Sequence, residues 1–367
     1  MSLHKGEIHE SLAKILAGDQ NKTPKIHYGP NHKYAIISDI HLGNGGNADN
    51  FSQNTETLQT ALNYYFDNGY SLILLGDIEE FWQFDLDEIH EFYKNTVYAS
   101  FQRFFKEDRF YRVFGNHDHE WAGLNDPTTN GGVDWDYKHA AEGIRIGDHI
   151  LLVHGHQGTI ESDKNSWFSR FWVRSFRSVE GIAKLFGYGK KEATASLIPN
   201  DHERTFYQWA KKNKKVLICG HTHRATFASL SYFDWLQEEE SRLTAEIQML
   251  NQQDPRDKKN IRKKCREKGK IVAALSDERN RDRTFEPLEN DAEATPCYFN
   301  TGCCLYDNGI TSIEIDGTEI HLTKWENDMT QPPVERRKVF WDERDEDDDQ
   351  VRIFSHDLNK IIDKVTH

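Results

Sequence analysis

The sequence contains few cysteines, no long apolar run and no excess of basic residues, and each absence excludes a class of protein. Its five cysteines form no Cys-x-x-Cys pair, which argues against a thiolate metal site or a redox motif. No apolar segment reaches the about 18 residues that a membrane-spanning helix needs, and residues 1–20 lack the apolar core of a secretory signal. We therefore expect reduced cysteines and a cytoplasmic protein.

The charge balance of the chain is acidic. Lys and Arg number 46 against 60 Asp and Glu, which gives a net charge of -14 over 367 residues. This balance disfavours a nucleic-acid partner held by overall charge. The basic runs at 211–215 and 258–264 are the candidates for a local nucleic-acid surface, but such runs are also typical of solvated helix faces. The length suits one large domain with appendages.

Five short polar segments each follow an apolar run that is typical of a buried strand. They are Asp39-Ile40-His41, Gly76-Asp77, Gly115-Asn116-His117-Asp118, His154-Gly155-His156 and Gly220-His221-Thr222-His223. In an open α/β sheet the carboxyl ends of the strands face a common crevice. Asp, Asn and His offer the oxygen and nitrogen ligands that divalent cations prefer. The sequence therefore predicts a metal site where these strands end.

The order D-x-H, G-D, G-N-H-D, H and G-H-x-H resembles the calcineurin-like metallophosphoesterase superfamily. The resemblance covers roughly residues 33–227, with closing strands near 297–325. It implies an α/β fold, namely a four-layer α-β-β-α sandwich with helical insertions. It also implies an enzyme that hydrolyses a phosphoester or diphosphate bond, by attack of a hydroxide that bridges two metal ions.

The resemblance also assigns ligands to two divalent cations. Asp77 would bridge both cations. The remaining ligands are Asp39, His41 and His223 for the first cation, and Asn116, His154 and His221 for the second. A site of oxygen and nitrogen ligands without thiolate suits Mn, Fe or Zn, and we expect Mn.

Four further side chains are candidates for catalysis or substrate binding. In the family His117 lies beside the substrate phosphate, where it would stabilise charge or protonate the leaving oxygen. Glu80 would orient His117, unless it is a surface carboxylate. Asp118 is a supporting candidate. His156 would either touch the phosphate or support His154.

The substrate is less well defined by the sequence. Segments 38–43 and 74–82 are similar to the UDP-2,3-diacylglucosamine diphosphatase branch, although that branch usually has Arg at the position of His117. An aromatic stripe near Arg170, Arg174 and Arg177 fits a lid that holds a diphosphate, or a helix that packs on the core. A nucleotide or nucleotide-sugar diphosphate is our first hypothesis, and a phosphodiester, nucleic-acid or phosphoprotein substrate is the second.

The chain divides into three expected parts. Residues 1–32 are an N-terminal extension, 33–327 the metallophosphoesterase domain and 328–367 an acidic tail. The domain carries a helical lid at about 160–213 and a polar helical insertion at about 230–296. For this insertion a helical hairpin is our first interpretation and a partly disordered loop the second. That hairpin is a candidate for self-association. A non-catalytic scaffold with a partner-binding arm is the alternative of another class.

Overall fold

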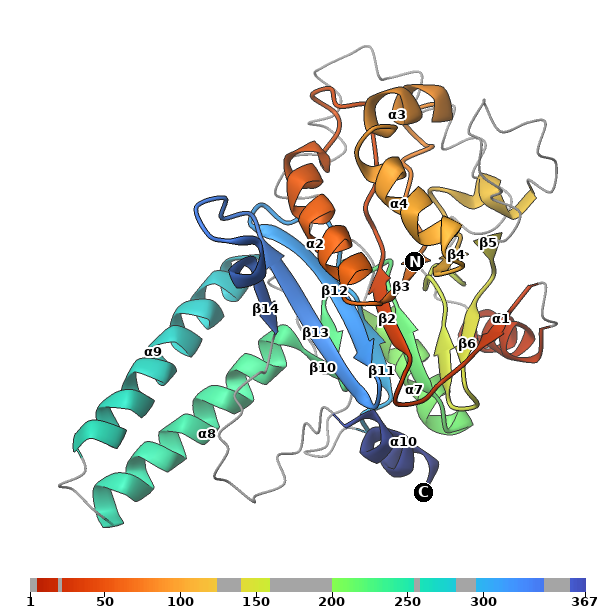
Figure 1. Cartoon of the computed structure of the whole chain (residues 1–367). Helices are drawn as coiled ribbons and strands as arrows, with labels where there is room; N and C mark the ends of the chain where they lie inside the picture. Colours follow the sequence, from red (N-terminus) through yellow and green to blue (C-terminus); the bar gives the residue numbers. More distant parts are fainter. Residues whose placement is uncertain are drawn as a thin grey trace.

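The computed structural model describes residues 5–18, 22–123, 140–158, 200–253, 258–281, 295–339 and 357–367. Its centre is a pair of seven-stranded sheets (Figure 1). The first sheet has the order β1 (Lys25–Ile26), β6 (Ile144–Ile146), β7 (Ile150–Leu152), β8 (Val216–Cys219), β11 (Tyr298–Asn300), β9 (Thr226–Phe227) and β10 (Leu230–Ser231). The second has the order β14 (Arg337–Val339), β13 (Glu319–Glu326), β12 (Gly309–Asp316), β2 (Lys33–Ile37), β3 (Ser71–Leu75), β4 (Phe110–Val113) and β5 (Ala140–Ala141).

The central strands of both sheets run parallel. In the second sheet β2, β3, β4 and β5 pair in parallel, and in the first sheet β7, β8 and β11 do so. These strands are short apolar runs, because parallel strands of this fold class are buried on both faces. Their carboxyl ends therefore lie at a common edge of each sheet, where the polar motifs begin.

The main core lies between the two sheets. Ile36 and Ile73 of the second sheet join Leu151 and Ile218 of the first in one buried cluster. A second cluster packs the other face of the second sheet against α2 (Thr55–Asp67) and α4 (Val97–Lys106). Helices α1 (Lys5–Ala17), α7 (Asn200–Asn213) and α10 (Leu358–Thr366) contribute buried side chains on the side of the first sheet. The expected four-layer α-β-β-α sandwich is confirmed.

Shorter helices complete the described chain. They are α3 (Leu86–Tyr93) and the single-turn 3₁₀ helices Ser52–Asn54, His119–Gly123 and Pro333–Arg336. Among the described residues, no helix is long and apolar enough to cross a membrane. All five cysteines are free, and four of them are buried.

The two ends of the chain take part in the core. In α1 the apolar residues Ile8, Leu12 and Ile15 recur at helical spacing and are buried. Strand β1 then extends the first sheet. At the other end β14 extends the second sheet, and α10 buries Ile361 and Val365. The acidic run at 342–349 lies outside the described residues.

The two expected insertions differ in how much of them is described. Of the lid at 160–213 only α7 is described, and its Phe206 and Trp209 are buried in the core. Arg170, Arg174 and Arg177 lie outside the described residues. Helices α8 (Tyr232–Gln253) and α9 (Lys258–Arg281) lie side by side and project from the sandwich (Figure 1). They form the helical hairpin that the polar composition predicts.

Candidate metal centre

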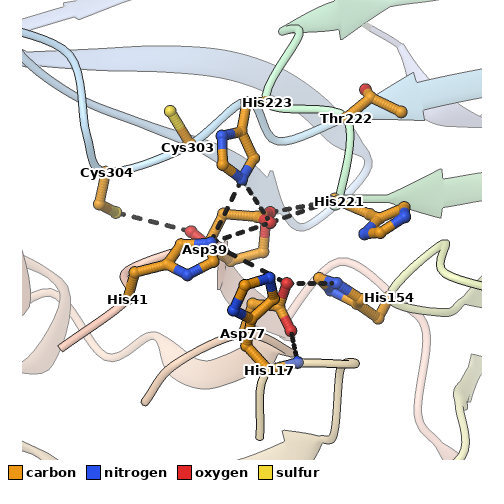
Figure 2. A network of polar contacts seen from close by, with 12 residues as sticks. Asp39, His41, Asp77, His117, His154, His221, Thr222, His223, Cys303 and Cys304 are labelled. Atoms are coloured by element: carbon orange, nitrogen blue, oxygen red, sulfur yellow. Dashed lines mark hydrogen bonds and ion pairs between the residues drawn. The ribbon is translucent and has the colours of Figure 1, made fainter. Parts of the chain in front are cut away.

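The residues that the sequence singles out as ligands converge at the carboxyl ends of the parallel strands. Figure 2 shows Asp39, His41, Asp77, His154 and His223 gathered around one space. Three sets of ligand atoms each lie within 4.8 Å of one another, and two of them consist of expected ligands alone. Those two are Asp39, His41 and His223, and Asp77, His154 and His221, whereas the third joins His41 and Asp77 to His117. Six of the seven expected ligands therefore fall into two adjoining clusters.

Several ligand atoms from different motifs lie within contact distance of one another. Asp77 Oδ2 lies 3.0 Å from His154 Nε2, and Asp39 Oδ1 lies 3.2 Å from His223 Nε2. His41 Nε2 is 3.3 Å from His223 Nε2 and 3.9 Å from an oxygen of each aspartate. Lone pairs that face one another in this way need protons or a cation between them.

The atoms present fit divalent cations of oxygen and nitrogen chemistry. His154 Nδ1 lies 2.9 Å from the Leu75 carbonyl, which can only accept, so Nδ1 carries the proton and Nε2 offers a lone pair to the cluster. Among the residues that the structure describes, His221 Nε2 and both side-chain amide atoms of Asn116 are buried and find no hydrogen-bond partner. An unsatisfied buried polar atom costs about 1–3 kcal/mol. Coordination to a cation would remove that cost.

Electrostatics within the cluster favour the same conclusion. Burial opposes the charged form of Asp77, but His154 and His117 hold the pKa of this carboxyl well below its usual range. Burial likewise opposes protonation of His154, but the Asp77 carboxylate raises the pKa of His154 to about 9. A proton on His154 thus compensates Asp77 in the metal-free protein. Binding of a cation to these atoms displaces that proton.

The backbone of the ligand loops adopts the left-handed region, which the motifs alone did not reveal. Five of the expected ligands have positive φ: Asp39 (52°), His41 (53°), Asp77 (53°), His221 (69°) and His223 (56°). Such backbone conformations cluster at functional sites. The motif glycines permit the close approach of the loops. A Cβ on Gly115 would lie 2.1 Å from Asp77 Oδ1, and one on Gly220 would lie 2.5 Å from Asp39 Oδ2.

Glu80 is buried between two histidines and is not a surface carboxylate. Its Oε1 lies 2.9 Å from His117 Nδ1, and its Oε2 lies 2.8 Å from His41 Nδ1. Burial disfavours the charge, but His117 and His41 together lower the pKa of Glu80 to about 2. The indole of Trp82 stacks on His117 with ring centroids 3.9 Å apart, and its Nε1 donates to the Asn116 carbonyl. The sequence did not reveal this contact of Trp82.

Asp118 and His156 lie beside the clusters. The Asp118 carboxylate accepts hydrogen bonds from the backbone N–H groups of Gly115, Asp77 and Ile78, and it forms an ion pair with Arg112. These four donors occupy its lone pairs, so it ties two motif loops together. The ring of His156 is buried 5.5 Å from that of His154, and burial lowers its pKa to about 3.

Several supporting residues escaped the sequence motifs. Glu79 accepts from Arg112, Tyr98 and Trp121 in a buried network behind Asp77. A charged residue within the apolar run of β4 was the signal for Arg112, because a buried charge requires a partner. Asn300 donates to the Gly220 carbonyl at 2.7 Å. No local pattern marked Asn300.

Comparison with known families decides the assignment. A family model described as calcineurin-like phosphoesterase matches residues 32–225, more than half of the chain. The chain belongs to the calcineurin-like phosphoesterase family. This phosphoesterase is thus a metal-dependent enzyme, in a family that generally binds two divalent metals, and the clusters at Asp39 and Asp77 are its candidate metal sites.

Solved structures show weaker likeness. A cold-active protein-tyrosine phosphatase of a psychrophilic Shewanella species is 12% identical, with 88% of this chain and 84% of that chain covered and a TM-score of 0.34. A protein serine/threonine phosphatase from Saccharomyces cerevisiae is 13% identical, with 61% and 73% covered and a TM-score of 0.28. At these scores the likeness carries no argument about substrate. No curated protein matches the chain.

Proposed function

We propose that this phosphoesterase hydrolyses a phosphoester or diphosphate bond with two Mn²⁺ ions, and that Asp77 bridges them. The observation that carries the proposal is the sharing of Asp77. The Asp77 carboxylate lies in one cluster with His154 and His221, and in a second cluster with His41 and His117. A carboxylate has two oxygens and can serve two cations at once. The assignment of Asn116 to the second cation is supported by its buried amide, which has no hydrogen-bond partner in the described part of the chain.

The metals and the protein divide the chemistry between them. Divalent cations, when bound, lower the pKa of a coordinated water and neutralise charge on phosphoryl oxygens. His117 is the proposed acid or charge stabiliser, because a ring nitrogen lies within 4.8 Å of ligand atoms of His41 and Asp77. The Glu80 carboxylate accepts a hydrogen bond from Nδ1–H of His117, so the Nε2 atom of His117 points away from Glu80. Trp82 restricts rotation of the same ring by stacking.

A nucleotide or nucleotide-sugar diphosphate is the proposed substrate. Support comes from segments 38–43 and 74–82, which resemble the UDP-2,3-diacylglucosamine diphosphatase branch and which line this site through Asp39, Asp77 and Trp82. This resemblance supports the diphosphate bond as the target. His117 in place of Arg distinguishes this chain from that branch, so the groups attached to the diphosphate are to be identified with a substrate panel.

Hydrolysis of bis-p-nitrophenyl phosphate tests the proposed chemistry. Wild type is expected to need Mn²⁺, to lose activity with EDTA and to recover it when Mn²⁺ returns. Asp77→Asn should remove nearly all activity, whereas the exposed Asp67→Asn is the control and should behave as wild type. Metal-dependent turnover that survives in Asp77→Asn would overturn the bridging role. A panel of nucleotide-sugar diphosphates, single-stranded DNA and phosphopeptides then decides the substrate class.

We also propose that the α8–α9 hairpin mediates self-association. It projects from the sandwich, and Met249 and Val272 on it are large apolar side chains that are about half exposed. The run 258–264 near its tip carries five basic residues, whereas α8 carries an acidic run at 238–240. Two hairpins packed antiparallel would bring unlike charges together. Replacement of 232–281 by a short glycine linker should reduce the number of chains per particle, as found by light scattering from the measured mass divided by the mass of one chain, and should leave bound metal unchanged. An unchanged number of chains would contradict the proposal.

A further inference from the structure

The first turn of α7 contacts two loops that carry proposed ligands of the second cation. His202 and Glu203 lie in this turn and are only 1% and 4% exposed. Buried polar side chains of this kind need a partner. Each of the two finds its partner in a different ligand loop.

His202 holds the loop of His154. Its Nε2 lies 2.6 Å from the carbonyl oxygen of Gly155. A carbonyl only accepts, so Nε2 carries the proton and donates. Burial lowers the pKa of His202 to about 4, so the ring stays neutral near pH 7. Gly155 has φ of 111°, a backbone conformation with few restraints of its own. The hydrogen bond therefore fixes the peptide between Gly155 and His156, one residue beyond the ligand His154.

Glu203 holds the loop of His221 and His223. It accepts a hydrogen bond from the hydroxyl of Thr222, which lies between these two histidines. Its other oxygen lies 3.5 Å from the guanidinium of Arg224. Both histidines have left-handed backbone conformations, so the loop needs contacts from outside to remain in place. Glu203 supplies two of them from a rigid helix.

We propose that His202 and Glu203 are positioning residues that set the affinity of the second cation. They act through Gly155 and Thr222 and touch neither the cation nor the substrate. The inference rests on the proposed two-cation site. Partners that orient metal ligands typically change metal affinity about 10- to 100-fold when they are removed, and we expect an effect of this size.

A titration of metal-free protein with Mn²⁺, with free Mn²⁺ counted by electron paramagnetic resonance, tests the proposal without any substrate. His202→Leu removes the donor and keeps apolar bulk, whereas His202→Gln keeps an N–H donor. We expect His202→Leu to weaken one of the two sites about 10- to 100-fold and His202→Gln to restore much of that loss. Asp201→Asn, an exposed change in the same turn, is the matched control and should bind as wild type.

Thr222→Val tests the second contact from the partner's side. This variant removes the hydroxyl that donates a hydrogen bond to Glu203, and it should weaken the same Mn²⁺ site as His202→Leu. If His202→Leu fails to fold, Thr222→Val alone tests the positioning role. Folded His202→Leu and Thr222→Val proteins that bind both ions as tightly as wild type would overturn the positioning role. A wild type that binds fewer than two Mn²⁺ ions would instead count against the proposed function. The two failures are thus distinguishable.

Discussion

Replacement of Arg112 by Met should destabilise the protein strongly, because Arg112 is the cation of a buried ion network. Its side chain is 3% exposed, and it pairs with Asp118 at 3.0 Å and with Glu79, both of which are fully buried. Its guanidinium also lies 4.7 Å from the ring centroid of Trp121. Arg112→Met keeps a long apolar side chain but leaves two carboxylates without their cation.

The expected loss in the free energy of unfolding is about 3–5 kcal/mol at pH 7. This is the usual penalty for breaking a buried pair, since the remaining charge stays in a medium of low polarity. The cation–π contact with Trp121 adds about 0.5–2 kcal/mol at most. Because total stability is about 5–15 kcal/mol for a typical domain, the variant should be folded but marginal.

The pH dependence provides an internal check. Burial raises the pKa of Asp118 above its usual range, and Arg112 opposes that rise. A carboxyl with a raised folded pKa binds its proton more tightly in the folded state, so stability falls as the pH rises through that pKa. Loss of Arg112 enlarges this effect. The difference between wild type and Arg112→Met should therefore be greatest at neutral pH and should narrow as the pH falls toward the pKa of Asp118.

Urea unfolding followed by tryptophan fluorescence measures the free energy of unfolding at pH 7 and its dependence on pH. The midpoint should fall while the slope with denaturant stays constant, which indicates a loss of stability without a change in exposed surface. Arg103→Met is the control. Arg103 is 43% exposed and pairs with Asp67 at the surface, where an ion pair is worth about 0–1 kcal/mol. A loss in Arg112→Met no larger than in Arg103→Met would refute the reasoning.

Three further outcomes follow from the site. His117→Gln should lower kcat about 100-fold or more while two Mn²⁺ ions stay bound, and the loss should be greater for alkyl esters than for nitrophenyl esters, since only the former need a protonated leaving group. Glu80→Gln should lower kcat with a smaller change in KM; an unchanged kcat would show that the contacts to His41 and His117 do not matter for turnover. Gly115→Ala should abolish activity and also lower the unfolding midpoint, because the added Cβ would fall 2.1 Å from Asp77 Oδ1 and 2.6 Å from the Asp77 backbone nitrogen.

The motifs located the site because they lie in short segments that the strands place at a common edge. The order of apolar runs and polar segments was enough to predict the parallel strands and the convergence of Asp39, Asp77 and His154. The helical spacing of apolar residues was less informative about where one helix ends and the next begins. Apolar residues such as Phe92, Val97 and Phe101 recur at helical spacing, yet they belong to two helices, α3 and α4, because the chain turns at Thr96 (φ −120°, ψ −92°).

Contacts between residues far apart in the sequence were beyond local patterns. Asn300 and Gly220 are 80 residues apart in the sequence, and their hydrogen bond exists only once β11 pairs with β8. Residues 1–32 were predicted to be an extension, since one amphipathic segment before Pro24 and Pro30 gives no sign of a docking surface. In the structure α1 buries Ile8 and Leu12 in the main core. An amphipathic pattern shows that a helix has an apolar face, but it does not show which surface covers that face. The sequence therefore did not reveal that α1 packs on the core.

The need for these distant contacts follows from the ligand loops themselves. Five left-handed ligand residues cost about 1 kcal/mol each in backbone energy, somewhat less for Asp and His, which tolerate this region better. The converging carboxylates of Asp39 and Asp77 add mutual repulsion. Together these terms approach the whole stability of a domain. Hydrogen bonds that Asp118, Asn300 and Glu203 form with these loops therefore help to keep the site in place in the metal-free chain. Cations that bind the folded site alone must then raise its stability, by an amount that grows with their free concentration.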